Sequence, residues 1–211
     1  VLQLIAGYRN RGHQQAKLDP LGLMPRPAVA DLDIATHGLS LADMDTVFQT
    51  GNLAIGKDEC TLREMVDAMN AIYCGSIGIE YMHIVDTAQK RWIQQRLEGK
   101  RGQPGFSVEI KKDLLEQVTA AEGLEKYLGT KFAGAKRFGL EGGESLIPMI
   151  DELIQRAGSY DTKEVVIGMA HRGRLNVLVN ILGKKPANLF DEFAGKMFNQ
   201  TGSGDVKYHQ G

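Results

Sequence analysis

The chain has few cysteines and no long apolar run, and each absence excludes a class of protein. Two of its 211 residues are cysteines, Cys60 and Cys74, which lie fourteen positions apart (74 − 60) without a CxxC or a Cys/His cluster. This pattern argues against a disulfide scaffold or a zinc site and favours reduced thiols in a cytosolic protein. No apolar run approaches the roughly 20 residues that cross a bilayer, and no signal peptide is recognisable, so no membrane partner is expected.

An excess of charge of one sign is also lacking. The formal net charge is −1, which gives no overall electrostatic attraction to nucleic acid or to an anionic membrane. With 43% hydrophobic and 24% charged residues, the composition is that of a globular protein with one or two cores. The first residue is Val and the last segment is glycine-rich without a closing element, so we expect the chain to be a piece of something longer.

Helical patterns dominate residues 1–130. In "TLREMVDAMNAIY", Thr61 and Glu64 form a capping box, and apolar residues follow at spacings of three and four. "DTAQKRWIQQRLEGK" predicts a second helix capped by Asp86, with Trp92, Ile93 and Leu97 on one face. Residues 110–128 predict two helices broken near residues 120–123, and the N-terminal segment predicts a helix that ends by Asp19-Pro20.

The pattern changes near residue 130 to that of an α/β domain. A helix is predicted within "ESLIPMIDELIQRAG" (residues 144–158), with Pro148 tolerable only in its first turn. Glu164 to Ala170 is an apolar run typical of a buried parallel strand. A helix from Asn176 to Gly183 follows. The predicted fold class is therefore α/β: a helical region (1–130), then the incomplete start of a parallel-sheet domain (131–211), whose other strands are expected beyond Gly211.

His171 and Arg172 stand directly after the predicted strand, where ligands gather in open α/β sheets. A basic turn at that position is also often a plain solvated connection, and Gly173 is explained by a turn that needs a positive φ. The pattern alone leaves both interpretations open.

Four motifs resemble a known family in order and spacing: "YRNRGHQQAKLDPLG", "KRFGLEGGES", "GMAHRGRLNVLVN" and "GSGDVKYHQG". They are similar to the N-terminal portion of the thiamine-diphosphate-dependent decarboxylase component of 2-oxoglutarate dehydrogenases. The resemblance covers essentially the whole chain, and residues 131–211 would open the first thiamine-diphosphate-binding domain.

The resemblance implies an activity and a set of site residues. In that family a 2-oxo acid is decarboxylated oxidatively on thiamine diphosphate, and the succinyl group passes to the lipoyl group of an acyltransferase subunit in the tricarboxylic acid cycle. It implies His171 and His209, thirty-eight positions apart (209 − 171), as the catalytic pair, and Arg172 as a coenzyme contact. The Mg²⁺ ligands of the family lie in a later motif outside this chain. A homodimer in the bacterial cytoplasm, or in the mitochondrial matrix of a eukaryote, is expected.

The other polar motif residues are expected to have structural rather than catalytic roles. Arg11 and His13 favour capping or interface roles, and His37 and His83 structural roles. Some relatives bind calcium through a second histidine after His13; because Gln14 stands there, Asp31 and Asp33 are expected to be surface carboxylates and no metal site is predicted. Gly139, Gly142 and Gly143 are assigned to turns or tight packing, since no GxxxxGK[ST] is present.

Two other functions remain open. A homologous decarboxylase of 2-oxoadipate shares the same motifs, and one methylene changes pocket binding by only about 1–3 kcal/mol. The chain as given is also compatible with a non-catalytic helical scaffold or docking module.

Overall fold

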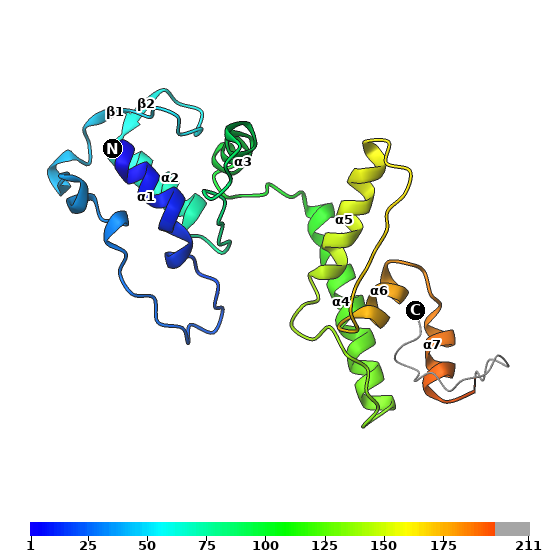
Figure 1. Cartoon of the computed structure of the whole chain (residues 1–211). Coiled ribbons are helices and arrows are strands. Elements are labelled where there is room, and N and C mark those ends of the chain that lie inside the picture. The colour runs from blue at the N-terminus through cyan, green and yellow to red at the C-terminus, as the bar shows by residue number, and fades with distance from the viewer. Residues whose placement is uncertain (197–211) are drawn as a thin grey trace. The chain divides into compact units, whose positions relative to one another are not determined.

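The computed structural model describes residues 1–196, and these form two compact units. Unit 1 comprises Val1–Gly105, and the described part of unit 2 runs from Phe106 to Lys196 (Figure 1). Nowhere in this described part is there a helix long and apolar enough to span a membrane.

Unit 1 is built from three α-helices, short 3₁₀ helices and one small antiparallel sheet. The α-helices are α1 (Leu2–Arg11), α2 (Leu62–Tyr73) and α3 (Thr87–Gly99). The 3₁₀ helices are η1 (Gly12–Gln15), η2 (Ala30–Leu32), η3 (Ile34–His37) and η4 (Leu41–Asp43). Strands β1 (Val47–Gln49) and β2 (Glu59–Thr61) pair with Phe48 opposite Cys60.

The core of unit 1 lies between α1 and α2. Its buried side chains come mainly from these two helices and include Leu4, Ile5, Tyr8, Leu62, Met65, Met69, Ile72 and Tyr73. The predicted capping box starts α2: the Thr61 side chain accepts from Glu64 N–H, and the Glu64 carboxylate accepts from Thr61 N–H. The helical stripe predicted over this segment is therefore confirmed as core packing.

Helix α3 begins where predicted, and most of its predicted apolar face packs against the core. Asp86 accepts from the backbone N–H of Gln89 and caps the helix. Ile93 and Leu97 of the predicted face are half-buried and pack against the core of unit 1. Trp92 is 54% exposed, and the Arg96 guanidinium covers its ring at 3.6 Å. Glu98 is the fully buried side chain of α3, which periodicity missed because it assigns a charged residue to solvent.

Unit 2 contains four helices among its described residues. They are α4 (Val108–Lys131), α5 (Leu146–Ser159), α6 (Arg174–Asn180) and α7 (Pro186–Phe193). The prediction of two helices broken near residues 120–123 is wrong, because α4 runs without interruption. Gly123 costs a helix interior only about 1 kcal/mol, and the burial of Ala121, Leu124 and Leu128 outweighs that cost.

The predicted strand Glu164 to Ala170 is also wrong for the described residues, where this run forms neither strand nor helix. Val166 is 93% exposed, and Val165 and Ile167 are exposed as well. A strand exists only through hydrogen bonds to a neighbouring strand, and no neighbour for this run lies among residues 1–196. The structure shows a mostly helical chain with one small sheet, which is compatible with part of an α/β protein.

The segments after this run start and stop close to the expected positions. Helix α6 begins at Arg174, two residues before the prediction, and ends at Asn180 rather than near Gly183. Gly183 adopts φ 75° in the following turn. Pro186 is the first residue of α7, where its missing N–H carries no penalty. Pro148 occupies the first turn of α5, as predicted.

The domain boundary predicted near residue 130 coincides with the end of α4 and stays a prediction. The division of the chain into two compact units falls between residues 105 and 106.

Candidate functional site

Two motifs that are far apart in the sequence meet in unit 2. The first is the glycine-rich loop 136–143 before α5, and the second is the turn 171–173 that starts α6. Gly173 N–H donates to the carbonyl oxygen of Phe138 at 2.8 Å. The Arg172 guanidinium Nη1 donates to the carbonyl oxygen of Gly139 at 3.2 Å. We call this pair of segments the loop–turn site.

His171 and Arg172, the two predicted site residues in the described chain, both lie exposed on the loop–turn site. The imidazole of His171 packs on the ring of Phe138, with centroids 4.2 Å apart and planes inclined at 44°. The prediction that His171 lies in a turn ahead of a helix is confirmed. The contact with Phe138 had no signal in the sequence, because it joins two segments far apart in the chain.

Two unusual backbone conformations shape the loop–turn site. Gly173 has φ 76°, and a Cβ at this position would lie 2.5 Å from Leu140 Cδ1, so the prediction of a positive φ is confirmed. Phe138 has φ 46°, which is rare for a bulky residue and carries strain of about 1–3 kcal/mol. Strained residues of this kind concentrate at functional sites, because the surrounding structure must hold them in place.

The glycines of the loop have the roles that were predicted. Gly142 has φ 84°, as a turn requires. A Cβ on Gly139 would lie 2.1 Å from Glu141 Oε2 and 2.5 Å from Glu125 Oε2, so a larger residue here would displace these carboxylates.

Charged side chains of both signs line the loop. Glu141 accepts from its own backbone N–H, and together with Arg137 and Arg172 this contact holds the pKa of its carboxyl below the usual range. Arg137 Nη2 donates to Glu141 Oε1 at 2.6 Å. At pH 7 the ionised Glu141 carboxylate therefore lies beside the guanidinium groups of Arg137 and Arg172.

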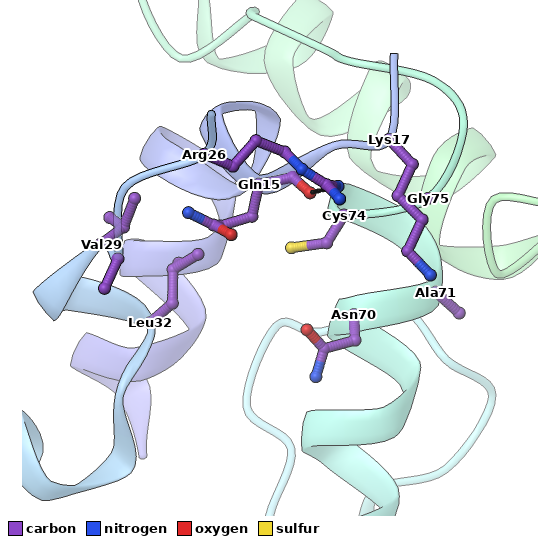
Figure 2. Close-up of a pocket in the computed structure, with 10 residues that line it drawn as sticks. Gln15, Lys17, Arg26, Val29, Leu32, Asn70, Ala71, Cys74 and Gly75 are labelled. Atoms are coloured by element: carbon purple, nitrogen blue, oxygen red, sulfur yellow. Dashed lines mark hydrogen bonds between the residues drawn. The ribbon is translucent and has the colours of Figure 1, made fainter. Parts of the chain in front are cut away.

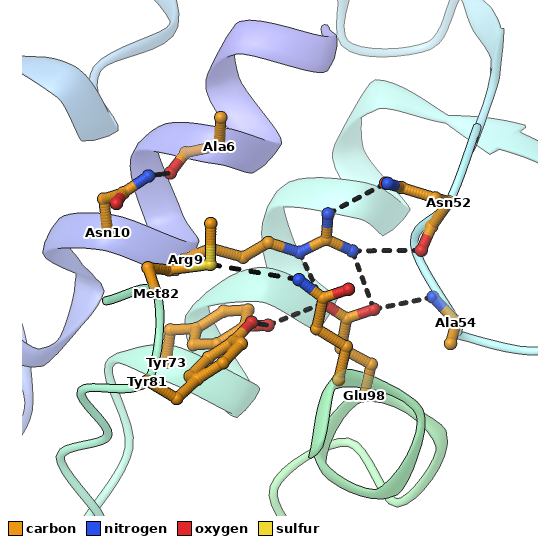
Figure 3. A network of polar contacts seen from close by, with 10 residues as sticks. Ala6, Arg9, Asn10, Asn52, Ala54, Tyr73, Tyr81, Met82 and Glu98 are labelled. Carbon is orange, nitrogen blue, oxygen red and sulfur yellow. Dashed lines mark hydrogen bonds and ion pairs between the residues drawn. The ribbon is translucent and has the colours of Figure 1, made fainter. Parts of the chain in front are cut away.

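A second polar cluster, in unit 1, is structural. Figure 3 shows Arg9 of the "YRNR" motif reaching Glu98 of α3, with Arg9 Nε at 2.8 Å from Glu98 Oε1 and Nη2 at 3.0 Å from Oε2. Tyr73 O–H also donates to Glu98 Oε1 at 2.6 Å, and Ala54 N–H donates to Oε2 at 2.7 Å. Arg9 is 6% and Glu98 0% exposed, so no ligand reaches this pair in unit 1.

Two open pockets lie in unit 1, beside its helices α1 and α2. The larger has a volume of about 760 Å³ and lies where η1 and the loop after it face the end of α2 (Figure 2). Lys17, Arg26, Asn70 and Cys74 are among its lining residues, and burial raises the pKa of the Cys74 thiol. The second, of about 600 Å³, lies along α1 and is lined by Arg11, Gln14, Asp31 and His37 among others.

The polar residues near α1 find partners within the protein. Arg11 pairs with Asp31, and His13 Nε2 lies 2.8 Å from Glu80 Oε1. Asp33 accepts from Ala35 N–H and caps η3. Within residues 1–196, no group of three or more His, Cys, Asp or Glu side chains is placed to hold a metal ion. His209, the second predicted catalytic residue, lies outside the described residues.

Comparison with known proteins gives one consistent result. The chain is 64% identical over 211 residues to the 2-oxoglutarate dehydrogenase E1 component of Azotobacter vinelandii, covering 100% of this chain and 22% of that protein. It is a match to a segment of this enzyme component. The protein of the same name from Cupriavidus necator is 57% identical over 209 residues, with 99% and 22% of the two chains covered. That of Haemophilus influenzae is 48% identical over 213 residues, with 100% and 23% covered.

The chain spans about a fifth of the length of these curated E1 components. No family model matches it. The similarity extends along the whole of this chain, so it includes the loop–turn site as well as unit 1.

Proposed function

We propose that this chain is part of the decarboxylase (E1) component of a 2-oxoglutarate dehydrogenase, and that the loop–turn site forms one wall of its active site. The observation that carries the proposal is the 64% identity to an E1 component along the whole chain. The contact between loop 136–143 and turn 171–173 supports it, because it gathers His171, Arg172 and Phe138 at one exposed edge.

His171 is suited to a 2-oxo acid. A neutral imidazole can donate a hydrogen bond to a carboxylate or to a developing oxyanion. Phe138 lies against one side of the ring and thereby limits its orientation. His209 is proposed as the second histidine of the site, and a dianionic substrate gives each imidazole a partner at one of its ends.

Arg172 fits a diphosphate. A guanidinium has five N–H donors, and the carbonyl oxygen of Gly139 uses one of them, so the exposed side chain retains donors for an anion. We therefore propose Arg172 as a contact of thiamine diphosphate. When bound, this coenzyme supplies the carbanion and electron-sink chemistry that decarboxylation of a 2-oxo acid requires. The Mg²⁺ that accompanies it is proposed to be held by residues outside this chain.

The partners follow from the same proposal. A lipoyl-bearing acyltransferase subunit would receive the succinyl group, and a homodimer would complete the coenzyme site between subunits. The names of the relatives support a place in the 2-oxoglutarate dehydrogenase reaction. The bacterial cytoplasm, or the mitochondrial matrix of a eukaryote, is the location that this reaction implies.

The test is the activity of full-length variants. His171→Ala and His209→Ala should each lower kcat/KM for 2-oxoglutarate by about 10²–10⁴, the usual range for a positioned proton donor or acceptor. The melting temperature should change little, because His171 is exposed and supports little of the core. Variants that keep wild-type kcat/KM but melt earlier would refute the catalytic role.

The coenzyme role of Arg172 has a separate test. Arg172→Lys keeps the charge but loses the planar two-pronged donor, so the dissociation constant for thiamine diphosphate should rise in the full-length protein. An unchanged constant would contradict the assignment.

Two further measurements address the alternatives. Comparing turnover of 2-oxoglutarate and 2-oxoadipate by the full-length protein decides between the two decarboxylases. Titrating the 211-residue chain calorimetrically with thiamine diphosphate and Mg²⁺ tests whether the site needs the remaining protein. Micromolar binding by this piece would contradict the view that the metal ligands lie elsewhere.

A further inference from the structure

Behind the loop–turn site lies a buried carboxylate, Glu125 of α4, which is 4% exposed. Its Oε1 accepts from the backbone N–H of Leu140 at 2.8 Å and from Asn176 Nδ2 of α6 at 3.0 Å. Its Oε2 faces Arg137 Nε at 3.9 Å. One side chain thus connects helix α4, the loop and the helix that follows the turn.

The connection of Glu125 to the loop is specific. Asn176 is itself 1% exposed and also donates to the carbonyl oxygen of Ala121 at 2.9 Å, so its amide is fixed on α4. The missing side chain of Gly139 lets the loop backbone lie against Glu125 Oε2. A buried carboxylate is unfavourable unless hydrogen bonds and a nearby cation compensate its charge. Glu125 has two such hydrogen bonds, and the Arg137 guanidinium is the nearby cation.

The loop needs such an anchor because Phe138 is held at φ 46°. Without the hydrogen bond at Leu140, the loop would relax toward a backbone conformation that a phenylalanine prefers. Relaxation would move the carbonyl oxygens of Phe138 and Gly139, which bind Gly173 N–H and the Arg172 guanidinium. It would also remove the ring that packs on His171.

We propose that Glu125 is a positioning residue of the loop–turn site: by accepting the Leu140 N–H, it holds Phe138 and Gly139 where they orient His171 and Arg172. This inference rests on the function proposed above, and it assigns to Glu125 no contact with substrate or coenzyme. What matters is the hydrogen-bond acceptor at the position of Oε1, since both bonds to the loop and to α6 end on that oxygen.

Three variants of the full-length enzyme distinguish the position of the acceptor oxygen from the charge of the side chain. Glu125→Gln keeps an oxygen at the position of Oε1 and loses the charge. Glu125→Asp keeps the charge, but its shorter side chain withdraws the oxygens from Leu140. Glu125→Ala removes both. We expect kcat/KM for 2-oxoglutarate to stay within about threefold of wild type in the Gln variant and to fall at least about tenfold in the Asp and Ala variants.

A matched control comes from the same helix. Glu122 is a carboxylate on the surface of α4 whose side chain is 54% exposed, and it forms an ion pair with Lys126. Glu122→Ala should leave kcat/KM unchanged. If Glu125→Ala does not fold, the comparison of Gln with Asp still decides, because the proposal requires the Gln variant to be the more active one.

A readout that does not depend on activity is amide hydrogen exchange of the coenzyme-free protein. Peptides that cover residues 136–143 and 171–175 should exchange faster in Glu125→Ala and Glu125→Asp and near the wild-type rate in Glu125→Gln. Exchange in α3 should not change, because the Arg9–Glu98 cluster there belongs to unit 1.

A double-variant cycle distinguishes a positioning role from a purely structural one. If Glu125 acts through His171, adding Glu125→Asp to His171→Ala should lower kcat/KM by much less than Glu125→Asp does alone. An equal loss in both backgrounds, or an Asp variant as active as wild type, overturns the inference. A fully active His171→Ala overturns the proposed function instead, so the two failures are distinguishable.

Discussion

Removing the guanidinium of Arg9 should destabilise unit 1 strongly. Arg9 makes two hydrogen bonds to Glu98 and two to Asn52, and Glu98 is 0% exposed. In Arg9→Met the carboxylate keeps only the donors of Tyr73 and Ala54 and becomes an uncompensated buried charge. Breaking a buried pair in this way costs about 3–5 kcal/mol, a large part of the usual stability of about 5–15 kcal/mol.

Trp92 provides the assay, since it is the only tryptophan of the chain and lies on α3, the helix that carries Glu98. Its fluorescence during urea unfolding of the 211-residue chain reports on unit 1. With a slope of about 2 kcal/mol per molar urea, a loss of about 4 kcal/mol lowers the midpoint by about 2 M. Arg91→Met, an exposed arginine of the same helix, is the control and should change stability by less than about 0.5 kcal/mol.

The charge itself can be tested by a second substitution. Glu98→Gln in the Arg9→Met background removes the unpaired charge. Its amide oxygen can accept from Ala54 N–H, and its NH₂ group can donate to the Tyr73 hydroxyl oxygen, so the double variant should be more stable than Arg9→Met alone. An Arg9→Met midpoint within about 0.3 M of the control would refute the reasoning, because the buried pair would then contribute no more than a surface pair.

Two further predictions concern stability. Gly123→Ala should stabilise α4 by about 1 kcal/mol, measured as a higher melting temperature by circular dichroism, because its Cβ meets no atom within 4 Å. Gly129→Ala should gain less, since its Cβ would lie 3.2 Å from Arg137 Nη2, and equal gains would contradict the packing argument. Burial raises the pKa of Tyr8 from 10.0 to about 12, so its stabilisation is complete below pH 10 and is lost as the pH rises to 12, a change of about 2–3 kcal/mol. Tyr8→Phe should make the fall of the unfolding free energy between these pH values less steep, while the raised pKa values of the buried Tyr73 and Tyr81 maintain part of it. An equally steep decline would count against the assignment.

Local signals were sufficient for most helices. Thr61 with Glu64 and Asp86 with Gln89 are caps formed within three residues, so the sequence alone locates the starts of α2 and α3. The positive φ of Gly173 and the place of Pro148 in the first turn of α5 are likewise local. For the same reason the sequence placed His171 and Arg172 in an exposed turn ahead of a helix, although their proposed roles came from resemblance.

Long-range contacts decided what local signals missed or misassigned. Helix α4 continues through Gly123 because its buried face packs in unit 2, and Glu164 to Ala170 forms no strand because no partner strand is present in the described residues. Glu98 is a buried carboxylate that binds Arg9, 89 positions away in the sequence. Glu125 is a buried carboxylate that binds the backbone N–H of Leu140, 15 positions away. Periodicity assigns charged residues to solvent. A buried charge is stable only when partners from distant segments surround it, and only the tertiary structure brings those partners together.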